Sequence, residues 1–238
     1  PGLPELPIFV PILVALAVVA LIGYLNGLMI CKLRMAPFIA TYGMASAVYG
    51  LNQLYFAKAP NNSQPIGGIR DDLTILSRFR IGGQVSFLVV IALVVMAVVW
   101  FILNRTTFGK NIYITGGNKE AAIYSGINVT RLKIKVFMIT AVLAGISGMI
   151  LASRLYSGQP NSALSYELDA IAAAVLGGTS LNGGYGTVVG TVIGALTIGV
   201  INNGMNLMNV PYFYQMVVKG LVILVAVYFD VRNKRKRS

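Results

Sequence analysis

The chain has 238 residues, of which 56% are hydrophobic and only 11% are charged. Soluble domains carry about 25% charged residues, so this chain cannot cover a water-facing surface and is predicted to lie in a membrane. Its net charge of +12 is concentrated between or after apolar blocks, which favours loops facing anionic lipid over nucleic-acid binding. With no histidine and with Cys31 as its single cysteine, it can form neither an internal disulfide nor a histidine-based metal or catalytic site.

Seven apolar blocks follow one another along the chain, and a helix of about 20 apolar residues spans the hydrocarbon core of a bilayer. The blocks run over 8–30, 36–56, 85–103, 136–151, 168–176, 187–208 and 212–229, and a tail follows at 230–238. The expected fold is an all-α, polytopic transmembrane helix bundle in which residues 1–238 form a single domain. The start Pro1-Gly2-Leu3-Pro4, without an initiator Met, is interpreted as a fragment boundary.

Lysine and arginine indicate how the chain is oriented. Six lie in 104–135, five in the tail and two in the turn 31–35. Cytoplasmic loops carry an excess of these residues, so all three segments, and with them the C-terminus, are predicted to be cytoplasmic. Blocks 168–176 and 187–208 must then together return the chain to the outside, either by both crossing or by both entering and leaving as half-helices.

Block 168–176 is too short to span the membrane alone, because its helix would cover only about half of the hydrocarbon thickness. A glycine-rich segment, 177–186, follows, and such backbone is tolerated at membrane depth only inside protein or beside a water-filled cavity. A broken or half-helix segment of this kind is typical of transport proteins. A short helix ending in an ordinary cytoplasmic loop is the alternative, and the sequence leaves both open.

Small residues recur at helical spacing in two blocks. Gly186, Gly190 and Gly194 lie four residues apart, as do Ala141 with Gly145 and Ala144 with Gly148. Small residues on one face let another helix approach closely, so these positions predict tight packing within the bundle.

The cytoplasmic segment 116–127 contains a predicted short helix. Asn118 is a good N-cap, the following Glu-Ala-Ala favours helix, and a glycine stops it. A short helix between two spans could dock into a partner's groove, or it could be an inert connection lying on the membrane. The candidate coupling residues are Gly117, Asn118, Glu120, Ala121, Ala122, Ser125 and Gly126.

Polar side chains inside apolar blocks are candidates for a transport pathway, with helix–helix hydrogen bonding as the alternative role. The candidate pathway residues are Asn52, Gln53, Asn202, Asn203, Asn206 and Gln215. Acids in a first helical turn complement the helix dipole, and a charge within a span is either functional or snorkels to the interface. The residues assigned a gating or structural role on these grounds are Glu167, Asp169, Gly177, Gly178 and Lys219.

Several of these segments, in the same order and spacing, resemble the ribose/galactose-type sugar ABC importer permeases. They are 105–111, 116–127, 166–173, 177–180 and 202–204, and the stretches 49–55 and 65–68 look closest to the galactose/methyl-galactoside permeases.

The resemblance implies a bacterial inner-membrane subunit that has lost N-terminal spans. It implies a second permease subunit, a periplasmic sugar-binding protein and a cytoplasmic ATPase that binds the coupling helix. No cofactor is implied, and the chain carries no phosphate-binding loop of its own. A permease for ribose or another pentose is the nearest alternative. An ion-coupled transporter or channel would need more acids within spans, and an intramembrane enzyme would need a nucleophile and base or a metal set.

Overall fold

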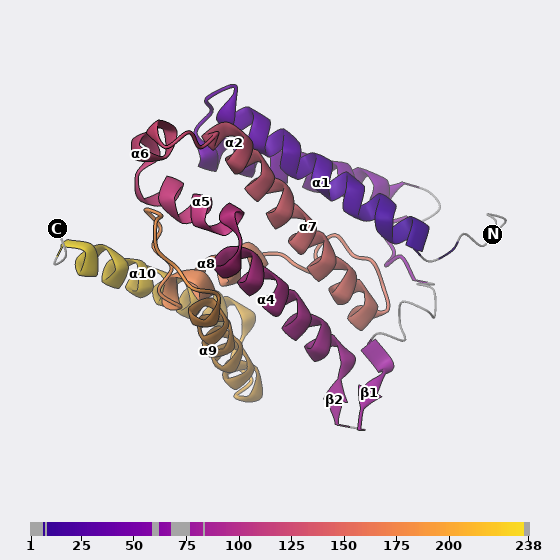
Figure 1. Cartoon of the computed structure of the whole chain (residues 1–238). Coiled ribbons are helices and arrows are strands. Elements are labelled where there is room, and N and C mark those ends of the chain that lie inside the picture. The colour runs from indigo at the N-terminus through magenta and orange to yellow at the C-terminus, as the bar shows by residue number, and fades with distance from the viewer. Residues whose placement is uncertain (1–6, 8, 59–61, 68–76, 83, 236–238) are drawn as a thin grey trace. The chain divides into compact units, whose positions relative to one another are not determined.

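The computed structural model describes residues 7, 9–58, 62–67, 77–82 and 84–235, most of them in helices (Figure 1). The chain divides into two compact units. The first unit comprises Pro1–Val95 and Asn128–Ala163, and the second comprises Met96–Ile127 and Leu164–Ser238. Helix α4, Phe87–Arg105, runs through the boundary between them.

The first unit is built on the antiparallel helix pair α1 and α7. It contains α1 (Phe9–Cys31), α2 (Pro37–Ala57), β1 (Arg80–Ile81), β2 (Val85–Ser86) and α7 (Val129–Leu155), and the two strands pair antiparallel. A Cβ at Gly27 would lie 2.9 Å from the Ile134 Cα, and one at Gly145 would lie 2.8 Å from the Val19 Cγ2. The predicted packing at Gly145 is therefore confirmed. The same prediction is wrong for Gly148, where an added Cβ would meet nothing within 4 Å.

The second unit contains a helix hairpin, a long C-terminal helix packed against it, and two short helices. Its elements are α5 (Thr107–Gly117), α6 (Lys119–Tyr124), α8 (Tyr166–Leu176), α9 (Val188–Leu207) and α10 (Tyr212–Arg235). Ala172 and Ala173 of α8 form a buried cluster with Ile198 of α9, and Val222 of α10 packs against it. Small residues in α8 thus let three helices meet closely.

Most large apolar side chains of the described residues face outward instead of into a core. Leu13, Val200 and Phe213 are 64%, 72% and 77% exposed. Four helices, α1, α4, α7 and α9, are long and apolar enough to cross a membrane. These observations confirm the all-α polytopic prediction, because lipid can solvate the apolar surface that water cannot.

Two helices that were expected to span the membrane, over 36–56 and 212–229, are less apolar or have a shorter apolar stretch than these four. Helix α2 forms over 37–57 but does not reach the apolar character of the four, and the apolar stretch of α10 covers only Phe213–Tyr228. The last tail residues, 236–238, lie outside the described residues.

Two predicted boundaries need correction. Block 136–151 is part of a longer helix, α7, which Asn128 caps by accepting a hydrogen bond from the Arg131 N–H at 3.0 Å. Charged residues at its ends interrupt the apolar run without ending the helix. The segment before the coupling helix, treated as loop, forms α5, and the hydroxyl of Thr106 caps it by accepting from the Gly109 N–H at 3.3 Å.

Candidate functional site

Helices α8 and α9 pack through backbone contact. A Cβ added at Gly190 would collide with the Gly177 carbonyl, and one at Gly194 would collide with the Ala173 carbonyl. One at Gly186 would lie 2.9 Å from the Thr179 side chain. The small face predicted on this helix is confirmed, and its partner is the short helix α8.

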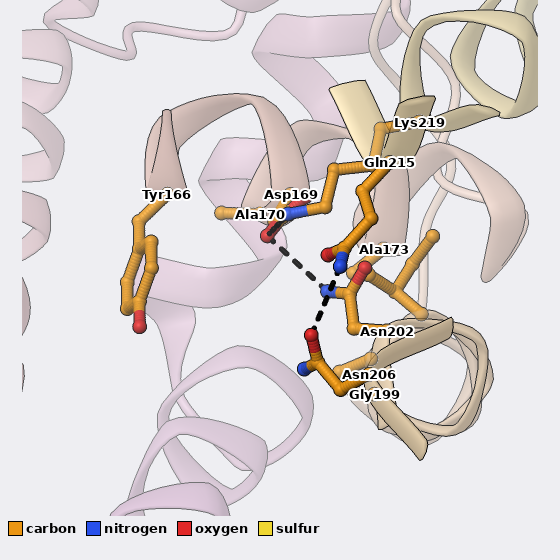
Figure 2. A pocket seen from close by; sticks show the side chains of 11 residues that line it. Tyr166, Asp169, Ala170, Ala173, Gly199, Asn202, Asn206, Gln215 and Lys219 are labelled. Carbon is orange, nitrogen blue, oxygen red and sulfur yellow. Dashed lines mark hydrogen bonds and ion pairs between the residues drawn. The ribbon is translucent and has the colours of Figure 1, made fainter. Parts of the chain in front are cut away.

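A cavity of about 470 Å³ lies where α8, α9 and α10 meet (Figure 2). Its apolar wall consists of small or branched aliphatic residues such as Ala173, Ala195 and Ile198, and Tyr166 stands at one side. Its polar lining residues are Asp169, Asn202, Asn206, Gln215 and Lys219. Cavities with an apolar wall and a few placed polar groups are the usual form of small-molecule sites.

An ion pair joins two of the helices in this cavity. The Lys219 ammonium on α10 lies 2.8 Å from the Asp169 Oδ2 on α8, and the two side chains are 25% and 21% exposed. The Asn202 side-chain amide on α9 also donates to this Oδ2, at 3.5 Å. One carboxylate oxygen therefore connects α8 with both α9 and α10.

The remaining amides organise the other end of the cavity. The Gln215 Nε2 donates to the Asn206 Oδ1 at 3.0 Å and to the Val210 carbonyl at 2.8 Å. The Asn202 Oδ1 is buried and has no hydrogen-bond partner among the described residues. Buried acceptors normally have a hydrogen-bond partner. This oxygen, which lies beside the cavity, still has the capacity to accept one hydrogen bond.

The structure brings together only part of the predicted pathway set. Asn202, Asn206 and Gln215 share the cavity, whereas Asn203 is exposed and is not among its lining residues. The participation of Asp169 and Lys219 in the same cavity was not expected, because fifty residues separate them. The sequence signal for this ion pair was Lys219, because a lysine within a membrane span usually pairs with an acidic side chain.

The other two predicted pathway residues, Asn52 and Gln53, belong to the first unit. Asn52 lines a separate cavity of about 310 Å³, together with Tyr55 and Gln159. Gln53 instead joins a hydrogen-bonded cluster, in which its Nε2 donates to the Tyr49 hydroxyl at 2.7 Å and to the Asn161 Oδ1 at 2.9 Å.

Near this cluster, the loop after α7 is tied to the segment before β1. Ile66 and Gly158 exchange backbone hydrogen bonds of 3.1 and 2.9 Å. The Arg78 guanidinium lies 5.1 Å from the centre of the Tyr156 ring. Hydrogen bonds from the Ser77 and Arg78 side chains, with the positive charge of Arg78, lower the pKa of the Tyr156 hydroxyl from its ordinary value.

The short helix predicted in segment 116–127 is present as α6. The Asn118 Oδ1 accepts from the Ala121 N–H at 3.0 Å, the Ser125 hydroxyl donates to the Ala121 carbonyl at 2.9 Å, and Gly126 has a φ of +79°. The predicted cap and stop are therefore confirmed, because a positive φ favours glycine.

One face of α6 is exposed. Ala122, one of the predicted coupling residues, is fully buried and anchors the helix. Glu120 is exposed, as are Ile123 and Tyr124, which are 53% and 90% exposed and were not among the predicted residues. An exposed aromatic residue in a short capped helix was the signal that could have found them.

The segment leading into α6 touches the loop between α8 and α9. A Cβ at Gly116 would lie 2.6 Å from the Gly184 N, and one at Gly184 would lie 2.8 Å from the Gly117 Cα. The Tyr113 hydroxyl donates to the Gly186 carbonyl at 2.9 Å. Gly183 and Gly184, with φ of +88° and +79°, combine positive φ with close approach, so glycine is required at both.

Residues 2–227 match the family model described as "Branched-chain amino acid transport system / permease component". The chain belongs to this permease family. Family membership agrees with the membrane fold and with the prediction of a transport component that is not an enzyme. It does not specify the substrate, because the relatives carry other substrates in their names.

Three relatives are named for two different sugars. The chain is 45% identical to the ribose import permease protein RbsC of Bacillus subtilis (strain 168), over 90% of this chain and 64% of the relative. It is 43% identical to RbsC of Escherichia coli (strain K12), over 98% of this chain and 71% of the relative. It is 40% identical to the galactose/methyl galactoside import permease protein MglC of Haemophilus influenzae (strain ATCC 51907 / DSM 11121 / KW20 / Rd), over 100% of this chain and 71% of the relative.

The chain thus spans between 64% and 71% of the length of these relatives. No solved structure matches it significantly.

Proposed function

We propose that this chain is the transmembrane permease subunit of an importer that moves a monosaccharide across a bacterial inner membrane and is driven by a separate ATPase. The observation that carries the proposal is its 40–45% identity, over most of its length, to permeases named for ribose and for galactose. The amide-lined cavity between α8, α9 and α10 supports the proposal, since amides donate to and accept from sugar hydroxyls.

Two sugars are candidates for the cargo. The segments 49–55 and 65–68 favour galactose or methyl galactoside, whereas the ribose relatives have the higher identities, 43–45% against 38–40%. The family description adds a third class, the branched-chain amino acids. The cavity favours a sugar over these, because its Asp169–Lys219 pair leaves no free charge for a zwitterion.

The proposed mechanism starts at α6. A cytoplasmic ATPase binds the exposed face around Glu120 and Tyr124, and its movement displaces α5 and α6. Because Gly116 and Gly117 lie against Gly183 and Gly184, the displacement reaches the loop that joins α8 to α9 and hence the helices that form the cavity. A second permease copy and a periplasmic binding protein would complete the pore and deliver the sugar.

Uptake measurements test this function directly. Cells that lack their own sugar permeases would express the gene for this chain with its ATPase and binding protein, and would receive labelled ribose, galactose or leucine. We expect uptake of one of the two sugars and none of leucine. Uptake of leucine without either sugar would overturn the proposal.

One variant tests the ATPase contact in the same cells. Glu120→Arg reverses an exposed charge on α6 and should abolish both uptake and co-purification of the ATPase. Gln84→Arg, at an exposed turn of the first unit, is the matched control and should change neither. Equal uptake by the two variants would contradict the role of α6.

A further inference from the structure

We propose that Asp169, Lys219 and Asn202 form the hydroxyl-binding centre of the cavity, and that this centre selects an uncharged polyol against zwitterions. The inference rests on the proposed function and assigns a substrate class and recognition residues to its cavity. It is drawn from three observations. Asp169 and Lys219 form an ion pair, the buried Asn202 Oδ1 has no hydrogen-bond partner among the described residues, and further side-chain amides line the same cavity.

The ion pair determines the charge that a substrate meets. Lys219 and Asp169 lie 2.8 Å apart, and about three quarters of each side chain is buried, so their charges cancel within the cavity. A zwitterion would need the ammonium and the carboxylate separately, so the pair would have to break although about three quarters of each side chain is buried. Leaving a half-buried charge without its partner is costly, so a neutral ligand is favoured.

The hydrogen-bond directions around the pair suit a hydroxyl. The Asn202 amide N–H₂ faces the Asp169 carboxylate, so the Asn202 Oδ1 points away from it and is a buried acceptor with no hydrogen-bond partner in the described part of the chain. The Lys219 ammonium has three N–H donors, and the pair with Asp169 uses one of them. A hydroxyl can accept from the second atom, and it can donate to the first when the Asn202 side chain turns its buried oxygen toward the cavity. Neighbouring hydroxyls of one sugar can do both.

The other lining groups extend the same chemistry. The Asn206 Oδ1 is occupied by Gln215, which leaves the Asn206 N–H₂ as a donor to a ligand. Tyr166, which is 55% exposed, lines the cavity beside Asp169 and offers an aromatic face to a pyranose or furanose ring (Figure 2). A polyol thus finds donors, acceptors and an apolar face in one cavity.

The first experiment removes the acceptor. Transport would be measured with ribose and 2-deoxyribose, and with galactose and 2-deoxygalactose, for the unaltered protein and for Asn202→Leu. Asn202→Leu should raise the KM for the transported sugar about tenfold or more, since it removes a buried hydrogen bond to the ligand. Asn203→Leu, at the exposed neighbour, is the matched control and should leave the KM unchanged.

Folding is separated from recognition by a milder variant. Asn202→Ala should lower the ratio between the KM of an analogue that lacks the hydroxyl bound by Asn202 and the KM of the sugar itself. This ratio does not depend on how much protein reaches the membrane. Deoxy analogues at the other ring positions would be included so that every hydroxyl is tested. Unchanged ratios for all analogues would overturn the proposal.

The second experiment tests the charge balance. Asp169→Asn or Lys219→Gln alone should reduce sugar uptake strongly, because each leaves one charge unpaired, whereas the double neutral variant should recover at least part of it. If the pair instead bound a zwitterion, the double variant would be as inactive as the single ones, and leucine would compete with the sugar. That result would overturn this inference.

The two proposals fail in different ways. Should the unaltered protein transport no sugar, the proposed function is wrong. Should it transport sugar while Asn202→Leu, Asn202→Ala and the charge variants behave like the unaltered protein, only the recognition residues proposed here are wrong.

Discussion

Asn118 connects two helices through one residue. Its backbone N–H donates to the Ile114 carbonyl and ends α5, while its side chain accepts from Ala121 and begins α6. Short helices depend on such caps, because six residues make few hydrogen bonds of their own. The position of the exposed Glu120 and Tyr124 therefore depends on this one side chain.

Removing this cap should weaken coupling. We expect Asn118→Ala to destabilise α6 by about 1 kcal/mol, with lower uptake and less co-purified ATPase. Asn128→Ala removes the same type of cap from the 27-residue α7, which packing against α1 stabilises, and should leave the ATPase contact intact. A loss of ATPase from the Asn128 variant, but not from the Asn118 variant, would contradict this role.

The hairpin of α8 and α9 is the element on which the cavity depends. Its helices approach through Gly177, Gly190 and Gly194, so that small residues replace the side chains which usually separate two helices. This close approach brings Asp169 of α8 within hydrogen-bond distance of Asn202 of α9. The glycines thus determine the geometry of the candidate site without lining it at its polar centre.

One methyl group at this contact should have a measurable cost. Gly190→Ala places a Cβ against the Gly177 carbonyl, and we expect it to destabilise the folded protein by about 1–3 kcal/mol, seen as a lower Tm in detergent. Gly204→Ala lies on the same helix where a Cβ meets nothing within 4 Å, and it should keep or raise the Tm through its better helix propensity. Equal Tm values would show that α8 and α9 do not pack in this register.

At the scale of the whole molecule, the solvent decides how the chain can fold. Large apolar side chains cover the outer faces of the helices, and few side chains are deeply buried among the described residues. A soluble protein could not expose such a surface, whereas helices in lipid satisfy their backbone internally and need only close packing between them. The predicted orientation of the bundle depends on the basic loops, which we expect to lie on the cytoplasmic side.

Cysteine labelling tests this orientation. In a Cys31→Ala background, Tyr124→Cys introduces one thiol at a position that is 90% exposed. Gln84→Cys introduces one in an exposed turn between blocks 36–56 and 85–103, which is expected to lie outside because 31–35 and 104–135 are predicted to be cytoplasmic. An impermeant maleimide added outside spheroplasts should label Gln84→Cys only, and it should label Tyr124→Cys only after the membrane is opened. The reverse pattern would place α6 outside the cell and leave it without an ATPase to bind.

Much of the fold could be predicted because it depends on local features. Apolar runs of suitable length became helices, Asn118 and Gly126 marked the ends of α6, and the glycine spacing around Gly190 indicated a packing face. Helix ends were missed where charge and helix propensity disagree. The apolar criterion ended at Lys135 and before Arg154, although a helix continues past both.

The sequence by itself determined that this protein lies in a membrane, that its chain forms helices, and where the short helix α6 begins and ends. These properties follow from the polarity and spacing of residues that are close along the chain. Only the tertiary structure decided that Asp169 pairs with Lys219, that Asn202 lies beside them, and that Gly116 rests on Gly184. Such pairs join residues far apart in sequence, and the packing of small side chains, which no local pattern specifies, brings them together.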